Sequence, residues 1–446
     1  MEIKSEDNWL SDLGGKFRQS LRWLTPGLGV KRWLLLVMLG ITFLGVGLAI
    51  LILDVYRTAP ETWWLPIISF ASLRFLPRYL RAIIFGGIGI SLVITGIWGI
   101  NHSLMAPFLK PGSKVVDALA GHRRRRRGPR ITVIGGGHGL SVLIRGLKNY
   151  SNNITAIVTV ADDGGSSGKL RKSFGILPPG DIRNCLAAMS NDEAMLTQLF
   201  QYRFPNGSSG LDGHSFGNLF ISALSDITGS FEEAVAESGR VLSVSGRVLP
   251  STLHNVQLVA DVRLPHLMSE VRVAGESQIP ETDGKVRRVW LEPNSPPAFP
   301  QAIKALLTAD AIVIGPGSLY TSLLPNLLVP DIADAIRSSR ALKLYICNVA
   351  SQVGETEGYS CDDHIEAINN HVGKGLFDIV IANNNFTGKL PDGIEWITMD
   401  EQLKMYSAVY SADLVDPNNP WRHDGEALSQ VIIDLLEERT GPLVEL

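Results

Sequence analysis

The chain has 446 residues, 45% of them hydrophobic, and a formal net charge of −3. It is too long for one ordinary hydrophobic core, so two or more units are expected. Its three cysteines, Cys185, Cys347 and Cys361, have no ligand-like spacing. This odd and sparse number excludes a cysteine-ligated metal site and is ordinary for a reducing compartment.

Two uncharged apolar segments, residues 33–53 and 82–100, lie near the start of the chain. Each has about 20 residues, enough to cross a hydrocarbon core of ~30 Å at ~1.5 Å per residue. A cleaved signal peptide fits poorly, because the first segment follows a long charged lead and a second segment comes after it. Residues 1–127 are therefore predicted to be a membrane anchor with two transmembrane helices and a polybasic linker.

Basic residues flank both apolar segments, and the second is followed by an unbroken arginine run, Arg123–Arg127. The positive-inside rule places both ends in the cytoplasm and the connection outside, although arginines in the connection weaken the contrast. We expect a multi-pass protein of the inner (cytoplasmic) membrane whose large C-terminal domain is cytoplasmic. The arginine run is expected to contact anionic headgroups. Since no aromatic residues are interleaved with it, no nucleic-acid partner is expected.

A glycine-rich turn follows the first strand of the C-terminal part. The β-branched run Ile131–Ile134 leads into Gly135, Gly136, Gly137 and Gly139, and a helical pattern comes next. Such a turn lets the backbone approach an anion at a helix start, which indicates a phosphate site. The spacing differs from GxGxxG and no single acid closes the next strand, which disfavours a nicotinamide oxidoreductase.

Two adjacent carboxylates end the second strand. Asp162 and Asp163 follow the apolar run Ile154–Val160 and precede Gly-Gly-Ser-Ser-Gly. Carboxylates beside a phosphate loop suit a Mg²⁺ ion that bridges to phosphate oxygens. The alternative is a solvated turn in which they cap a helix.

From Gly128 to Leu446 strands and helices alternate, which predicts an α/β domain with an open, mostly parallel sheet. A second strand–loop–helix carries Gly315-Pro316-Gly317-Ser318, expected to offer free amides at a helix start. Short strand patterns over residues 246–293 predict a β-rich insert, either a substrate lid or a subdomain. The site is expected along the carboxyl ends of the strands.

Five segments, in this order, resemble the gluconeogenesis-factor (YvcK-like) family, which is related to the CofD-like 2-phospho-L-lactate transferases. They are IGGGHGLSVLIRGLK, TVADDGGSSGKLRKSFGILPPGDIRNCLAA, GHSFGNLFISAL, IGPGSLYTSLLPNLLVPDIADAI and CNVASQVGETEGYSCDDHI. The resemblance covers residues 130–446 and leaves out the membrane region.

The resemblance implies a Rossmann-like fold that binds UDP-sugars such as UDP-N-acetylglucosamine. It implies a role in cell shape and peptidoglycan synthesis during gluconeogenic growth, with cell-wall synthesis proteins as candidate partners; self-association is left open. The alternative is a magnesium-dependent enzyme like 2-phospho-L-lactate transferase that uses a nucleotide-linked donor. Whether turnover is retained stays open.

The family motifs assign roles to residues of this chain. Asp162 and Asp163 stand at the position of the transferases' metal-proximal acids and would be catalytic in an enzyme. His138 stands where the family usually has threonine, so it either contacts phosphate with altered geometry or faces solvent. The implied ligand-binding residues are Gly135, Gly136, Gly137, Gly139, Asn184, His214, Ser215, Asn218, Gly315, Gly317, Ser318 and Arg422.

Overall fold

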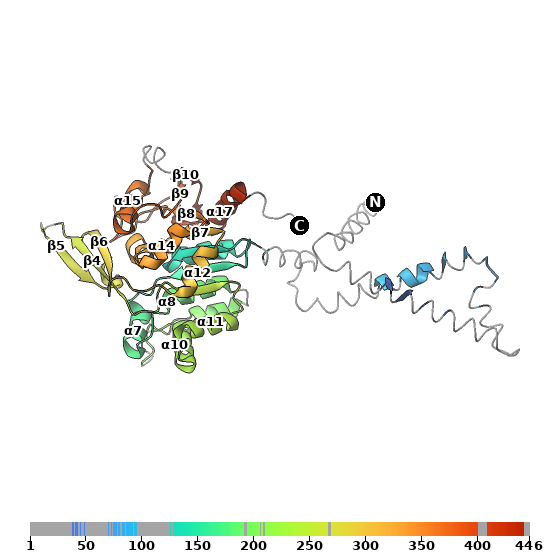
Figure 1. Ribbon diagram of the computed structural model, residues 1–446. Coiled ribbons are helices and arrows are strands. Elements are labelled where there is room, and N and C mark those ends of the chain that lie inside the picture. Colours follow the sequence, from blue (N-terminus) through green and yellow to red (C-terminus); the bar gives the residue numbers. More distant parts are fainter. Residues whose placement is uncertain are drawn as a thin grey trace, which may run out of the picture. The chain divides into compact units, whose positions relative to one another are not determined.

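The computed structural model describes residues 128–190, 194–205, 210–265, 269–399 and 408–440, together with Arg125, Gly207 and scattered residues between positions 38 and 95 (Figure 1). The chain divides into two compact units, Met1–Arg123 with Leu446, and Arg124–Glu445.

In the first unit the described residues form short helical and turn stretches. Several of their apolar side chains are exposed, including Met38, Ile83 and Ile88. No helix among the described residues is both long and apolar enough to cross a membrane. The two predicted spans, residues 33–53 and 82–100, lie partly outside the described residues, so they stay a prediction.

A seven-stranded parallel sheet forms the centre of the second unit. β1 (Ile131–Gly135) pairs with β2 (Ile154–Val158) on one side and with β7 (Ala311–Ile314) on the other. Every residue of these three strands is buried, as is typical of strands covered on both faces. The order is β10-β9-β8-β7-β1-β2-β3, with all neighbours parallel, which confirms the predicted α/β fold. The remaining strands are β3 (Arg247–Pro250), β8 (Leu342–Ile346), β9 (Ile379–Asn383) and β10 (Ala408–Ala412).

Helices lie on both sides of the sheet (Figure 1). One group of mutually packed helices is α6, α8, α11 and α17, and another is α12, α13, α14 and α15. The helices are α6 (Gly137–Leu147), α7 (Gly165–Phe174), α8 (Gly180–Met189), α9 (Ala194–Gln201), α10 (Phe216–Thr228), α11 (Phe231–Val241), α12 (Pro300–Thr308), α13 (Leu324–Leu327), α14 (Pro330–Ser338), α15 (Cys361–Val372) and α17 (Gly425–Thr440).

The last helix, α17, packs closely against α6. A Cβ atom on Gly146 would collide with the carbonyl oxygen of Gly425 and with the side chain of Ser429. Glycine at this position therefore lets the two helices touch. This contact fixes the hairpin of β11 (Val415–Asp416) and β12 (Asn419–His423), which precedes α17 directly.

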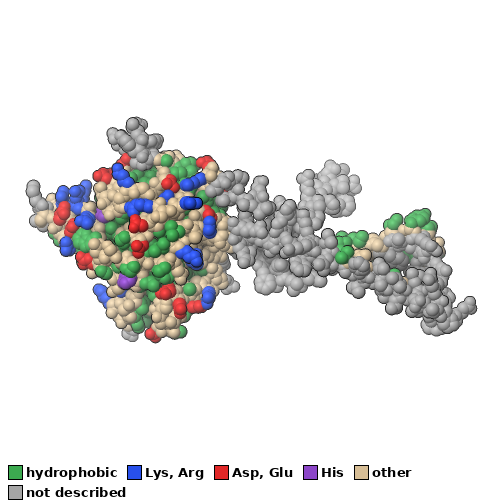
Figure 2. Space-filling view, viewed as in Figure 1, with side chains coloured by type: hydrophobic (Ala, Val, Ile, Leu, Met, Phe, Trp, Pro, Cys, Tyr) green, Lys and Arg blue, Asp and Glu red, His purple; other side chains and the backbone are tan. Residues whose placement is uncertain are grey.

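The β-rich insert is a separate antiparallel sheet that projects from the domain (Figure 1). Its order is β5-β4-β6, with β5 (Glu270–Ala274) and β6 (Lys285–Glu292) on either side of β4 (Gln257–Arg263). Figure 2 shows Lys and Arg together with Asp and Glu side chains over it. Residues 247–250, which the sequence analysis placed in the insert, instead form β3 and pair with β2. Short apolar strands look alike in sequence, and only long-range pairing separates them.

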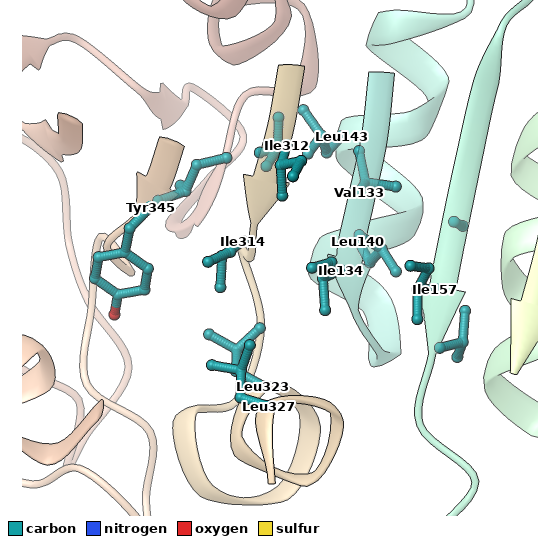
Figure 3. Packing of buried hydrophobic residues seen from close by; sticks show 14 of the residues in the cluster. Val133, Ile134, Leu140, Leu143, Ile157, Ile312, Ile314, Leu323, Leu327 and Tyr345 are labelled. Atoms are coloured by element: carbon teal, nitrogen blue, oxygen red, sulfur yellow. The ribbon is translucent and has the colours of Figure 1, made fainter. Parts of the chain in front are cut away.

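The hydrophobic core fixes the ends of the two central strands. Figure 3 shows Ile134 of β1 and Ile314 of β7 beside Leu140 of α6 and Leu323. All four side chains are almost fully buried. The loops that leave β1 and β7 therefore start from rigid positions.

Candidate functional site

Two glycine loops leave the sheet side by side. After β1 the chain continues to β2 on one side, whereas β7 lies on the other, so β1 and β7 flank the topological switch point. In open α/β sheets ligands bind in the crevice outside this point. The loops touch, because a Cβ on Gly139 would lie 3.1 Å from the carbonyl oxygen of Pro316 and one on Gly317 would lie 3.4 Å from that of Gly136. The predicted Gly135, Gly136, Gly137, Gly139, Gly315 and Gly317 thus come together.

The first loop brings the backbone close to a carboxylate. Gly137 has φ of +68°, a conformation that favours glycine, and it begins α6. A Cβ on Gly136 would collide with the carboxylate of Asp181, at the start of α8. Asp181 also accepts a hydrogen bond from the Gly137 amide. One of the amides expected to be free for phosphate is therefore used by a carboxylate that the sequence analysis missed.

Burial and the nearby charge of Asp162 raise the pKa of Asp181 to about 6. The sequence contained a weak signal for this residue, since Asp181 follows Pro-Pro-Gly at a predicted helix start. Only the tertiary structure shows that this helix starts beside the glycine loop.

Arg422 reaches the same loop from β12. Its Nη1 donates a hydrogen bond of 3.0 Å to Nε2 of His138, and the guanidinium stays exposed. Burial, and then the charges of Arg422 and Arg145, lower the pKa of His138, which keeps the ring neutral and able to accept this bond. His138 therefore supports Arg422 at the start of α6, a role different from the two considered from the sequence.

The second loop differs from the expectation of free amides. The buried carboxylate of Glu355 accepts hydrogen bonds from the Tyr320 backbone amide at 3.1 Å and from the Thr321 hydroxyl at 2.7 Å. These groups start the helical turn η4 (Leu319–Leu323), so the protein itself satisfies them. Ser318 precedes this turn and is partly exposed. A ligand role for Gly315, Gly317 and Ser318 stays a prediction.

The two predicted acids point to different partners. Asp162 accepts a hydrogen bond of 2.9 Å from the Gly164 amide, whereas Asp163 accepts one of 2.9 Å from the Ser277 amide in η3 (Glu276–Gln278). Asp163 thus holds the β-rich insert. Of the pair, only Asp162 lines the pocket described below. This separation corrects the expectation that both acids serve one metal.

Among the described residues, no group of three or more His, Cys, Asp or Glu side chains is placed to hold a metal ion. Magnesium commonly takes only one or two protein carboxylates, with water and phosphate oxygens completing its coordination. Asp162 and Asp181 fit that donor set, since each raises the pKa of the other. These two residues, rather than Asp162 and Asp163, would hold Mg²⁺.

A third acid, Glu276 of the insert, faces the same region. Burial, followed by the charges of Asp162 and Asp181, raises the pKa of Glu276 to about 8. Carboxylates brought together in this way repel one another unless a proton or a cation neutralises them. The insert therefore contributes to the site, and no local motif around Glu276 predicted this.

A pocket of about 240 Å³ opens beside Asp162, where the starts of α7, α8 and α10 meet. It contains the predicted Asn184 and Asn218, and it adds Arg183 and Arg203, which the sequence analysis did not select. Its lining comprises Asp162, Gly164, Gly165, Ser166, Ser167, Gly180, Asp181, Arg183, Asn184, Arg203 and Asn218.

Arg183 is the central cation of this pocket. It is 7% exposed, and its guanidinium donates to the Ser215 hydroxyl and, at 2.7 Å, to Oδ1 of Asn184. Burial and the charge of Arg203 lower the pKa of Arg183 to about 10, so it is still charged at neutral pH. Asn184 therefore acts here by orienting Arg183.

The other predicted polar residues support the pocket wall. Ser215 caps α10 by accepting from the Asn218 amide at 3.3 Å. Ser166 bonds to Nδ1 of His214 at 3.1 Å and accepts from Nδ2 of Asn218 at 3.1 Å. Asn218 is 1% exposed and keeps a buried Oδ1 without a partner. Cations and carboxylates thus face one small polar cavity, an arrangement suited to a phosphate group.

Residues 131–428 match the CofD family, described as 2-phospho-L-lactate transferase CofD. A putative gluconeogenesis factor from Nostoc sp. is 52% identical over 378 residues, which cover 82% of this chain and 80% of the relative. The gluconeogenesis factor of Bacillus subtilis is 45% identical over 322 residues, which cover 70% of this chain and 99% of the relative.

A crystal structure of a upf0052 family member from Bacillus halodurans has a similar fold. Its TM-score is 0.64 at 45% identity, and the match covers 68% of this chain and 98% of that chain. A putative gluconeogenesis factor from Clostridium acetobutylicum is 38% identical and covers 94% of this chain, so its match extends into the segment before Gly128. This chain belongs to the CofD family and, within it, to the gluconeogenesis factors.

Proposed function

We propose that this protein binds a nucleotide sugar, with UDP-N-acetylglucosamine as the expected ligand, at the carboxyl edge of its parallel sheet. In this proposal it is a membrane-tethered regulator of cell shape and peptidoglycan synthesis during gluconeogenic growth. The observation that carries the binding proposal is the position of Arg422, whose exposed guanidinium lies beside the glycine loop.

The chemistry of this corner suits a diphosphate. The start of α6 presents the positive end of a helix dipole, which favours an anion. Arg422 adds a planar fork of donors that can hold two phosphate oxygens at once. His138, kept neutral, accepts a hydrogen bond from Arg422 and so orients it. A nucleotide diphosphate bound here would place its sugar near Asp181 and the adjoining pocket.

The second candidate function is magnesium-dependent transfer of a phosphate-linked group. The pocket with Arg183 and Arg203 favours it, because it lies next to the carboxylates of Asp162 and Asp181. Magnesium held by these two acids would neutralise charge on a transferred phosphate. The arginines would bind that phosphate, and Ser215 and Asn184 would keep Arg183 in place. We favour the regulator, because the sequence motifs follow the gluconeogenesis factors.

The membrane location is part of the proposal. It rests on the two uncharged apolar segments, residues 33–53 and 82–100, and on the arginine run after them. The nucleotide-binding domain would then be cytoplasmic. If the full chain stays in the soluble fraction after gentle lysis, the tether is wrong. An extracellular signal from a reporter fused to Leu446 would overturn the topology.

Calorimetric titration separates the proposed functions. UDP-N-acetylglucosamine should bind the wild-type protein more tightly than NAD or GDP does, and with magnesium present it should be recovered unchanged. Tighter binding of NAD would support an oxidoreductase instead. Magnesium-dependent release of a nucleoside monophosphate from a nucleotide-linked donor would establish the transferase.

A further inference from the structure

The amino ends of the parallel strands, at the edge opposite the glycine loops, form a second polar surface. The chain enters the domain at this edge. The carbonyl oxygen of Arg125 accepts hydrogen bonds from the amides of Asn152 at 2.8 Å and Gly128 at 3.1 Å. The Asn153 side chain donates to the Gly128 carbonyl at 2.7 Å. The arginine run Arg123–Arg127 is therefore held at this edge through Arg125.

The domain adds its own basic residues along the same edge. Arg247 begins β3, Arg340 lies two residues before β8, and Lys374 lies in the loop before β9. All three side chains are exposed and have no ion-pair partner within the described part of the chain. At about 4.8 Å per strand, β3 and β9 lie roughly 24 Å apart. The unpaired cations are thus spread across most of the sheet.

The acids at this edge are already paired. Asp310 binds Arg130 at 2.6 Å. Asp378 lies 3.8 Å from Lys343 and 3.5 Å from Arg439, so it faces two cations. The unpaired charge along the strand starts is therefore positive.

A cavity of about 310 Å³ opens at this edge, between the starts of β1, β2 and β3. Arg247 brings a guanidinium to it, and amide and hydroxyl groups supply further hydrogen-bonding groups. Such groups suit a phosphate. The polar lining consists of Arg130, Thr132, Asn152, Asn153, Thr155, Arg247 and Thr308.

We propose that this edge, with Arg247, Arg340 and Lys374, binds the phosphate groups of anionic membrane lipids. The arginine run that leads into the edge brings it to the same surface. Because the glycine loops lie at the other ends of the strands, the nucleotide site then opens away from the bilayer. The orientation rests on the proposed membrane tether, whereas the lipid affinity of the edge does not.

The first test uses segment 128–446, which lacks the arginine run and the apolar segments. It lies within one compact unit, and a crystallised relative consists almost wholly of the matching part. The segment should sediment with phosphatidylcholine vesicles that contain phosphatidylglycerol, but not with pure phosphatidylcholine, and high salt should release it. Failure to bind the anionic vesicles would overturn the proposal.

Matched variants identify the surface. A basic residue near an anionic membrane strengthens binding about fivefold, so the double change Arg247→Glu/Lys374→Glu should weaken vesicle binding more than tenfold. The control is Lys285→Glu/Arg287→Glu, which places the same charge change on exposed residues of β6. Equal losses in the two pairs would show a non-specific charge effect and contradict the assignment.

Two soluble competitors distinguish other ligands. Glycerol phosphate should compete only weakly with vesicles, because it reaches one site and not the whole edge. Complete displacement by glycerol phosphate would indicate a site for a free phosphate compound. Tighter binding to a single-stranded oligonucleotide than to vesicles would indicate nucleic acid. Either result would overturn the lipid proposal.

The full chain tests the orientation. Its three native cysteines are all buried, so a single introduced cysteine can be labelled selectively. In bilayers containing phosphatidylglycerol, a spin label at Arg247→Cys should collide with nickel attached to lipid, and one at Arg287→Cys should not. The reverse pattern would overturn the orientation. If high salt extracts the full chain from membranes while segment 128–446 still binds anionic vesicles, the tether fails and the lipid-binding edge stands.

Discussion

Arg422 donates a hydrogen bond of 3.0 Å to His138 although 284 positions separate the two residues. The contact depends on the close approach of α6 and α17, which brings the β11–β12 hairpin to the glycine loop. A basic residue near the end of the chain and a helix start near the beginning of the domain thus form one anion site.

Replacing Arg422 with alanine should weaken UDP-N-acetylglucosamine binding by roughly 1.5–3 kcal/mol, the range for a hydrogen bond to a charged group. Arg422→Lys should recover only part of this, because lysine lacks the planar fork. Calorimetry measures both, with Arg287→Ala on β6 as the control. Wild-type affinity in Arg422→Ala would remove this residue from the site.

The two adjacent acids should respond differently to the same change. Asp162→Asn removes a charge from the pocket and should abolish any magnesium dependence of ligand binding or turnover. Asp163→Asn should have little effect, because the amide oxygen can still accept the hydrogen bond from the Ser277 amide. Titration with and without magnesium, together with thermal unfolding, checks both. Equal effects would show that both acids act on the ligand.

Stability should fall as pH rises, because of Glu276. Its pKa is about 8 in the folded protein and ordinarily 4.5. Its contribution to stability is therefore complete below about pH 4.5 and is lost as pH rises through 8, because the unfolded chain gives up the proton first. The slope from one group is at most about 1.4 kcal/mol per pH unit. Asp181, with a pKa of about 6, acts in the same direction over a narrower range.

Urea unfolding between pH 5 and 9 measures this slope, which should be reduced in Glu276→Gln (a range chosen to span roughly both pKa values). Glu281→Gln, at an exposed position four residues after the 3-10 helix begins, serves as the control. The hypothesis fails if the two variants have the same pH dependence.

Gly146→Ala should destabilise the domain. Alanine is favoured over glycine in a helix by about 1 kcal/mol. Here, however, the new methyl group would collide with the backbone of Gly425 and the side chain of Ser429, and overpacking of this kind costs about 1–3 kcal/mol or more. Backbone atoms cannot move aside as a flexible side chain can, so the clash should prevail. A higher unfolding temperature in Gly146→Ala would contradict this.

Gly146→Ala should also weaken UDP-sugar binding, because α17 positions Arg422. Gly239→Ala in α11 is the matched control, since its new methyl group would meet only ordinary contacts at 3.6 Å and 3.8 Å. Calorimetry of both variants at a temperature where both are folded separates the effect on binding from the effect on stability.

The sequence by itself determined the parallel α/β fold and the edge of the sheet where the glycine loops lie. Local patterns sufficed, because apolar strands such as Ile131–Ile134 and the glycines after them encode strand, turn and helix over a few residues. The family motifs likewise pointed to Arg422 before its neighbours were known.

Only the tertiary structure decided which side chains meet at that edge. Asp162 and Asp163 are neighbours in sequence, yet successive side chains in an extended segment point in opposite directions, so one faces the pocket and the other holds the insert. Asp181 and Glu276 arrive from other elements, and Glu355 takes the amides that the Gly-Pro-Gly-Ser loop was expected to leave free. Such contacts depend on long-range packing, which no local spacing in the sequence records.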